Sequence, residues 1–123
     1  MRLGISFAYP HKSPAEWAEK LRSMGLGACV FPVDHTAPDG LIEGYRKAAA
    51  DADIAIAEVG AWKNLLDPDE AVRAQNYEYV KNQLMLADHL HAGCCVDISG
   101  ACGEVWDGGY AENYATATFD RVV

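Results

Sequence analysis

The side chains in this sequence that are suited to catalysis or ligand binding lie at the ends of short apolar runs. Phe7 follows the first run, His35 follows the second, and Glu58 stands near the end of the third. Trp62 and Trp106 follow the third and fourth runs. Flat aromatic rings pack against the C–H faces of a sugar, while carboxylates and imidazoles bind its hydroxyls. This combination favours a small sugar or polyol as the ligand.

Glu58 has the clearest signal of a functional role among these residues. It ends an apolar stretch that begins at Ile54, and burying a carboxylate in such a strand is unfavourable unless it is paired or functional. We therefore expect Glu58 to bind substrate, and within this chain it is the candidate for an acid/base group. For the others, alternatives stay open: the tryptophans could merely close loops over a site, and His35 could be a solvated loop histidine.

Other reactive residue types have structural interpretations. Trp17 is expected to pack within a helix, and His89 and His91 fall at a helix end where a positive charge suits the helix dipole. The four cysteines form no C-x-x-C pair and no Cys/His zinc spacing, so we expect buried thiols in a reducing cytoplasm. Cys102 has no histidine beside it in its loop, which argues against a nucleophilic thiol.

The charge of the chain argues against several classes of partner. Eighteen acidic and ten basic residues give a formal net charge of −8, and the basic residues are scattered. Nucleic acids and anionic membrane surfaces both require a cationic patch, so neither is an expected partner. No apolar stretch approaches the roughly 20 residues of a membrane-spanning helix, and no secretory signal is visible. We therefore expect a cytoplasmic protein.

The elements that would position the candidate residues alternate between strands and helices in one domain, residues 1–123. Strands are expected at residues 2–6, 28–32, 54–59 and 94–98, and helices at residues 14–24, 38–51, 67–90 and 116–123. Ser13 is the expected cap of the first helix, with Glu16 closing a capping box. The expected buried stripes are Trp17, Leu21 and Met24 in the first helix, and Val80, Leu84, Ala87 and Leu90 in the third.

Each interval between strands accommodates one right-handed β-α-β crossover, so the sheet is expected to be parallel. An open doubly wound sheet and a (β/α)8 barrel both fit this pattern. The first turn, residues 6–12, lacks the glycine-rich sequences that bind nucleotide phosphates. The chain ends on apolar residues without a helix stop signal, and a barrel usually has roughly 250 residues. We expect an α/β fold of TIM-barrel type truncated to about four units, with strand order 1-2-3-4 and helices on one face.

Longer segments resemble the xylose isomerase-like TIM-barrel superfamily of sugar phosphate isomerases and epimerases, in its N-terminal half. The matching segments are residues 2–6, 30–35, 57–62, 86–88, 94–100 and 106–108. The resemblance implies a divalent metal, manganese, magnesium, cobalt or zinc, whose ligands come from strands five to eight and so lie outside this chain. It places Phe7, Glu58, Trp62 and Trp106, and also His35, in the wall of the substrate site.

Two residues depart from the pattern of the superfamily. His91 stands where a glycine is usual, at a left-handed position after the third helix. Asp97 stands where we expect asparagine, which adds a charge at the end of the fourth strand.

The resemblance implies a sugar or sugar-phosphate isomerase or epimerase that removes a proton next to a carbonyl, with its main acid/base groups beyond Val123. An inosose dehydratase-like lyase is an alternative, and a non-catalytic open-sheet binding module is another. The acidic charge argues against an apurinic endonuclease-like enzyme. Unpaired sheet edges would make the isolated chain associate with itself as a homo-oligomer or aggregate, without isomerase activity.

Overall fold

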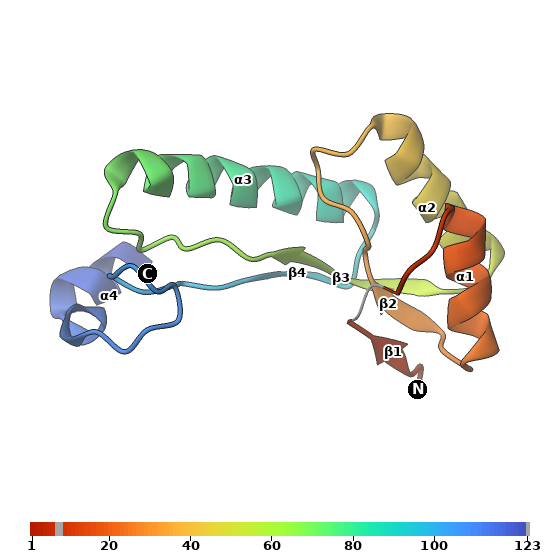
Figure 1. The fold of residues 1–123 in the computed structure, drawn as a ribbon, viewed down its shortest axis with the longest axis horizontal. Coiled ribbons are helices and arrows are strands. Elements are labelled where there is room, and N and C mark those ends of the chain that lie inside the picture. Colours follow the sequence, from red (N-terminus) through yellow and green to blue (C-terminus); the bar gives the residue numbers. More distant parts are fainter. Residues whose placement is uncertain (7–8, 123) are drawn as a thin grey trace. The chain divides into compact units, whose positions relative to one another are not determined.

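The computed structural model describes residues 1–6 and 9–122. The elements are β1 (Gly4–Ile5), α1 (Pro14–Ser23), β2 (Ala28–Val30), α2 (Asp39–Asp51), β3 (Ala55–Ala61), α3 (Glu70–His89), β4 (Cys94–Asp97), the short 3-10 helix η1 (Ala111–Tyr114) and α4 (Thr116–Val122) (Figure 1). The four strands form one sheet in the order β1-β2-β3-β4, which confirms the predicted α/β class and strand order. Within the described residues, no helix is both long enough and apolar enough to cross a membrane.

The strands are parallel and some are shorter than predicted. Gly4 pairs with Ala28, and Cys29 pairs with Ile56. β2 ends two residues before the predicted end at Pro32, because proline has no N–H to continue the ladder. β3 runs further than predicted, to Ala61, while β4 ends at Asp97 rather than at residue 98.

α1 begins at the predicted cap. The Ser13 hydroxyl accepts a hydrogen bond from the backbone N–H of Glu16 at 3.2 Å. The Glu16 carboxylate accepts from the N–H of Lys12 at 2.8 Å, whereas a strict capping box would use the N–H of Ser13. The predicted cap is therefore confirmed, and its reciprocal bond falls one residue earlier.

The predicted stripe of α1 is right for two of its three residues. Trp17 and Leu21 are buried, but Met24 is 49% exposed. Met24 lies outside the apolar face because α1 ends at Ser23 and the chain turns at Gly25, whose φ of 72° is left-handed.

The buried face of α3 differs from the prediction at one residue. Leu84 is 52% exposed, whereas Gln83 is only 2% exposed. The buried residues are spaced three or four apart, as on one helix face: Val80, Gln83, Ala87 and Leu90. The prediction chose Leu84 instead of Gln83 because leucine is apolar. A glutamine thus occupies a core position.

The end of α3 fits the structural roles predicted for its histidines. His89 forms a hydrogen bond with Glu43 of α2, with 2.6 Å between Nε2 and Oε1. His91 adopts a φ of 51°, the left-handed conformation in which glycine was expected.

The chain divides into two compact units. The first unit comprises Met1–Gly60 and Gln83–Cys95, and the second comprises Ala61–Asn82 and Val96–Val123. β3, α3 and β4 each contribute residues to both.

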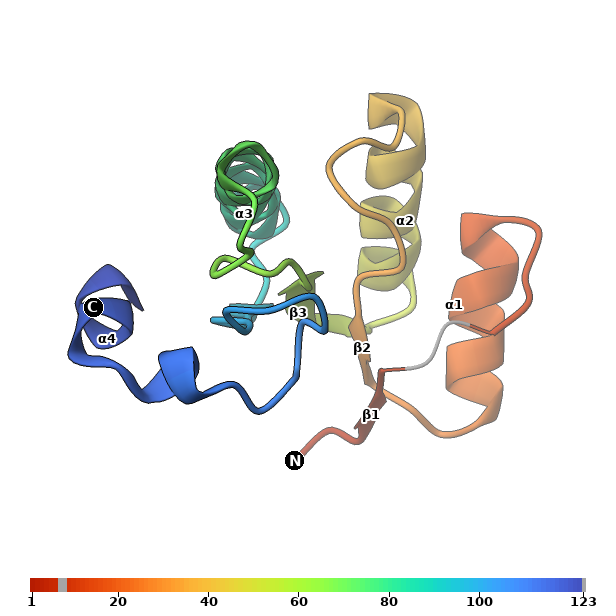
Figure 2. The same cartoon turned by 60° about the vertical axis from the view of Figure 1, so that its left-hand side comes forward.

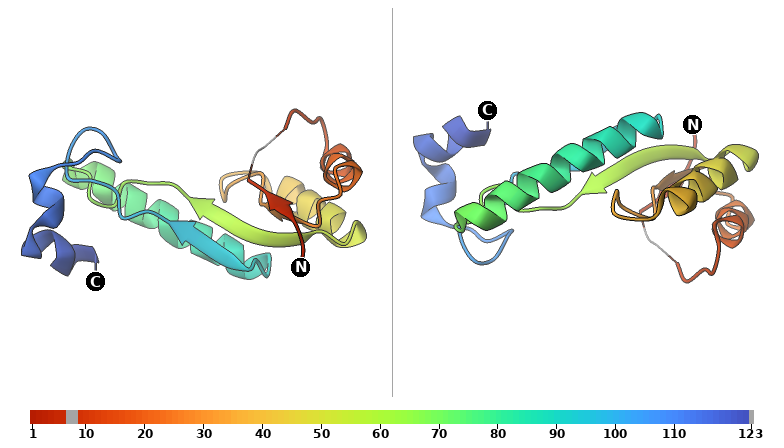
Figure 3. Two further views of the ribbon diagram at one scale, coloured as in Figure 1. Left: turned by 90° about the horizontal axis from the view of Figure 1, so that it is seen from below. Right: turned by 90° about the horizontal axis from the view of Figure 1, so that it is seen from above.

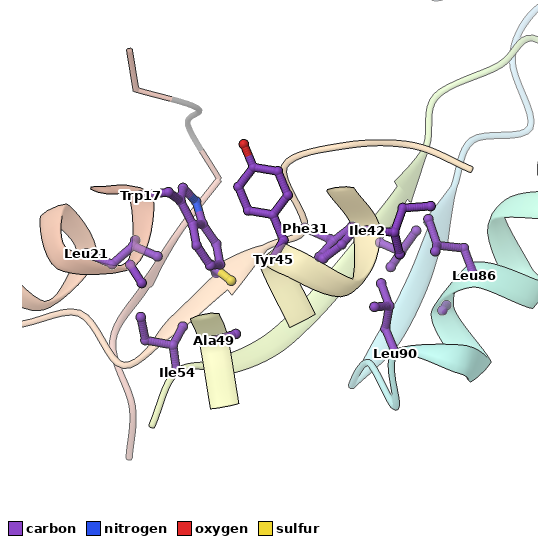
Figure 4. Packing of buried hydrophobic residues seen from close by; sticks show 13 residues of the cluster. Trp17, Leu21, Phe31, Ile42, Tyr45, Ala49, Ile54, Leu86 and Leu90 are labelled. Atoms are coloured by element: carbon purple, nitrogen blue, oxygen red, sulfur yellow. The ribbon is translucent and has the colours of Figure 1, made fainter. Parts of the chain in front are cut away.

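The first unit has an apolar core between its helices and one face of the sheet. The residues labelled in Figure 4 are Trp17, Leu21, Phe31, Ile42, Tyr45, Ala49, Ile54, Leu86 and Leu90. They come from α1, α2 and the end of α3 on one side and from the segments around β2 and β3 on the other. Figure 2 and the right-hand view of Figure 3 show α1 and α2 side by side. Within this unit, helices therefore cover a single face of the sheet, as predicted.

The second unit is organised around a buried asparagine. The Asn64 side chain donates to the carbonyl of Ala101 at 2.9 Å and accepts from the backbone N–H groups of Ala101 and Leu66, each at 3.0 Å. Gly100 passes so close that an added Cβ would lie 1.9 Å from the Asn64 oxygen, and its φ is 83°. Only glycine fits this backbone path.

The glycine-rich stretch after β4 is ordered by similar contacts. The Asn113 side chain accepts from the N–H of Cys102 and donates to the carbonyl of Gly108, both at 2.8 Å. The Tyr110 ring lies against Gly108, where an added Cβ would come within 2.5 Å of it. This stretch leads through η1 into α4, which confirms the predicted last helix.

Candidate functional site

Glu58 lies where β3 carries one extra residue opposite β2. Cys29 pairs with Ile56 and Val30 pairs with Glu58, so Ala57 is left over as a β-bulge. Strict alternation from Ile56, which packs against the core, would put Glu58 on the helix-covered face. The extra residue reverses the alternation, since a bulge re-aims the side chains that follow it.

Burial confirms the direction of the Glu58 side chain. Val59, the next residue, is 1% exposed and belongs to the core beneath the helices, while Glu58 is half-buried. Its partner Val30 is also outside the core cluster, although Cys29 and Phe31 on either side of it are inside. Glu58 therefore points to the face of the sheet that the helices of the first unit leave uncovered.

His35 is held near the end of β3 by a residue that the sequence analysis missed. The side-chain oxygen of Gln83 accepts from the backbone N–H of His35 at 2.8 Å and lies 3.1 Å from its Nδ1. The Gln83 amide nitrogen donates to the carbonyl of Gly60 at 2.7 Å. The sequence could have identified Gln83 by its position, because it falls at the helical spacing of the buried residues. A polar side chain buried there needs hydrogen-bond partners.

The two tryptophan candidates belong to the second unit. Trp62 is 57% exposed and Trp106 is 53% exposed, so neither ring is packed away in a core. Phe7 lies outside the described residues. The structure thus connects His35 to the end of β3, whereas convergence of all five candidate residues stays a prediction.

His11 and Tyr45 form a packing contact in the first unit. His11 Nδ1 lies 2.7 Å from the carbonyl of Tyr9, which only accepts, so Nδ1 donates. Its Nε2 then accepts from the Tyr45 hydroxyl at 2.6 Å, and burial raises the pKa of that hydroxyl. Both ring nitrogens of His11 are therefore hydrogen-bonded within the first unit.

The prediction of buried thiols is right for Cys29 and wrong for Cys94, which is exposed, while Cys95 and Cys102 are half-buried. Cys95 packs against the core while Cys94 is exposed, as adjacent residues of a strand should be. Burial raises the pKa of the Cys29 thiol to about 12, which makes it unreactive. The Cys102 sulfur lies 3.7 Å from the Thr118 hydroxyl.

The described residues contain no cluster of side chains that could bind the expected metal ion. Among the described residues, no three His, Cys, Asp or Glu side chains come together to hold an ion. Asp97, at the end of β4, has its carboxyl pKa raised by burial. The metal, whose ligands were predicted to lie outside this chain, therefore stays a prediction.

A groove on the helix side of the first unit lies away from the carboxyl ends of the strands. A groove of about 950 Å³ runs between α1 and α2 and is lined by small residues such as Ala15, Ala18 and Gly44, with Glu19 and Lys47 among its charged residues. None of the predicted site residues lines it. The candidate site in the first unit thus consists of Glu58 and the Gln83–His35 pair. A role for Trp62 and Trp106 of the second unit stays a prediction from the sequence.

Comparisons with profiles of protein families, with curated proteins and with solved structures give no match, so the family resemblance rests on the sequence segments alone.

Proposed function

We propose that this chain is the first half of a (β/α)8 barrel enzyme that isomerises or epimerises a sugar or sugar phosphate, with a divalent metal held elsewhere in the enzyme. The sequential parallel sheet and the one-sided helix cover of the first unit support this proposal. The observation that carries it is the bulge at Ala57, which turns Glu58 to the uncovered face of the sheet. In a parallel α/β fold, ligands bind at the carboxyl ends of the strands.

The residues of this chain bind and orient the sugar in the proposed site. The Glu58 carboxylate accepts hydrogen bonds from sugar hydroxyls, and the imidazole of His35 binds a further hydroxyl. The proton next to the carbonyl is then removed and returned by groups beyond Val123. A divalent ion, held by residues outside this chain, would polarise the carbonyl.

The proposal is tested by turnover of a panel of aldoses, ketoses and their phosphates. The enzyme is the polypeptide that contains the remaining β/α units, assayed in D2O with Mn²⁺ and again after chelation. We expect Mn²⁺-dependent interconversion with solvent deuterium appearing on the carbon next to the carbonyl.

Three outcomes would contradict the proposal. Interconversion without deuterium uptake would argue against proton abstraction. Net loss of water from a polyol would favour the inosose dehydratase-like lyase. Sugar binding without turnover, in the presence of metal, would favour a non-catalytic binding module.

A further inference from the structure

A pocket of about 410 Å³ lies in the second unit, between the start of α3 and the helix α4. Two arginines line it, Arg73 of α3 and Arg121 of α4, although they are far apart in the sequence. Pockets that bind small molecules in proteins have volumes of roughly 300–1,000 Å³. The size of this pocket therefore suits a small ligand, and its two guanidinium groups suit an anion.

Arg73 is fixed through one of its three nitrogens. Its Nη1 donates to the backbone carbonyls of Asp67 at 2.6 Å and Pro68 at 3.3 Å. Its Nε and Nη2 form no hydrogen bond with any residue of the chain that the structure describes. The side chain is half-buried, so these N–H groups are partly shielded from water. A guanidinium held in this way has further donors in place for the oxygens of a ligand.

Neither arginine forms an ion pair in the pocket. Among residues 1–6 and 9–122, no carboxylate oxygen lies within 4.0 Å of a nitrogen of Arg73 or Arg121. Two acidic residues also line the pocket, Asp67 and Glu112. The Asp67 carboxylate accepts from the backbone N–H of Asp69 at 2.9 Å, whereas Glu112 is exposed. Both positive charges thus remain available to an anion, and Glu112 opposes it.

The hydroxyl and the thiol in the pocket wall already donate to other groups. The Thr118 hydroxyl donates its one proton to the carbonyl of Glu112 at 2.7 Å. In the 3.7 Å contact between Thr118 and Cys102, the thiol must therefore be the donor. Among the described side chains of the wall, the donors left for a ligand are the N–H groups of the two arginines.

We propose that this pocket binds a small organic anion through a phosphate or carboxylate group that contacts both Arg73 and Arg121. Both kinds of group present two or more oxygens, which a guanidinium binds at two points. The pocket lies wholly in the second unit, so this binding site is independent of the proposed isomerase function.

The proposal is tested by calorimetric titration of the complete polypeptide with inorganic phosphate and, separately, with acetate. We expect saturable binding of at least one anion, with an affinity that falls as the salt concentration rises. Binding of phosphate alone would assign a phosphate ligand, and binding of acetate alone a carboxylate ligand. If both bind, the pocket accepts either group. No saturable binding of either anion would overturn the proposal.

Arginine substitutions test whether the anion binds in this pocket. Arg121→Met should weaken binding about tenfold, the effect of losing one charge-assisted hydrogen bond. Arg121 is exposed and forms no hydrogen bond with a described residue, so this variant should fold normally. Arg46→Met removes the same charge from the exposed surface of α2, outside the pocket, and should leave the affinity unchanged. Equal weakening by Arg121→Met and Arg46→Met would overturn the proposal, because only the net charge would then matter.

The acidic residue of the wall gives a test in the opposite direction. Glu112→Gln removes a negative charge that faces the anion, so it should tighten binding. Weaker binding would overturn the proposal, because the carboxylate rather than the arginines would then hold the ligand. Failure of these tests would leave the proposed function standing, since turnover and deuterium uptake test it separately.

Discussion

The two units of the chain are stabilised by different interactions. In the first unit, apolar side chains of three helices cover one face of the sheet, and Leu21 and Val59 are each 1% exposed. In the second unit, the loops are organised around hydrogen bonds of Asn64 and Asn113 and around glycines that make room for neighbouring side chains.

This difference predicts different responses to substitution. Apolar packing is non-directional, so the first unit should lose stability in proportion to the volume removed. Hydrogen bonds depend on position, so the second unit should be sensitive to the loss of single polar atoms. The predictions below test that contrast.

The largest expected effect is loss of core volume in the first unit. Leu21→Ala should lower the free energy of unfolding by about 3 kcal/mol, because Leu21 is almost fully buried. Urea denaturation measures this, and Met24→Ala, at a half-exposed position outside the apolar face, should change it by less than about 0.5 kcal/mol. Equal losses at the two positions would contradict the packing described for α1.

The next largest effect is expected from loss of the Asn64 side-chain hydrogen bonds in the second unit. Asn64→Ala should cost about 2 kcal/mol, since it leaves backbone groups of Ala101 and Leu66 without their partner. Hydrogen exchange should quicken at the amides of Ala101 and Leu66. Asn82→Ala, at an exposed position of α3, is the matched control. Unchanged hydrogen-exchange rates at both amides would argue against these hydrogen bonds of Asn64.

A smaller effect is expected from Gly100→Ala, through strain at its positive φ and the close Asn64 oxygen. We expect a loss of about 1–2 kcal/mol. In the double variant with Asn64→Ala, the loss should be less than the sum, because the obstructing oxygen is gone. Gly109→Ala, where an added Cβ meets nothing within 4 Å, serves as control. Strict additivity would refute the close approach.

The smallest effect concerns the charge of Asp97. Burial raises its pKa above the ordinary value of 3.8, so the folded state disfavours the ionised form. The resulting penalty is present above the raised pKa and disappears as the pH falls below 3.8. Asp97→Asn should therefore stabilise the protein by less than about 0.5 kcal/mol at pH 7, since the side chain stays partly solvated. A gain that persists at pH 3 in thermal unfolding would contradict this cause.

The contrast between the units also explains what the sequence predicts well. The alternation of apolar runs and helical stripes predicts the strand order, because burial is encoded in residue type and period. The capping-box sequence predicts the cap at Ser13. The prediction that Leu84 is buried was wrong, because it relied on the apolar side chain alone. The position of Gln83 along the helix, rather than its hydrophobicity, puts it on the buried face.

The site residues are predicted less completely than the fold. Glu58 is identifiable as a carboxylate in an apolar strand, but nothing in the sequence shows that Ala57 is an extra residue that reverses the alternation. Gln83 and Asn64 resemble ordinary surface amides in the sequence. Their roles depend on backbone groups that only the folded chain brings near, namely those of Gly60 and Ala101.

The central claim is that Glu58, turned by the bulge to the uncovered face of the sheet, binds sugar hydroxyls. The most direct measurement compares kcat/KM of the complete enzyme with that of its Glu58→Gln variant, with Glu19→Gln on exposed α1 surface as control. We predict a fall of about 10- to 100-fold for Glu58→Gln, the effect of losing charge-assisted hydrogen bonds, and none for Glu19→Gln. Equal kcat/KM for the wild type and Glu58→Gln would contradict the account.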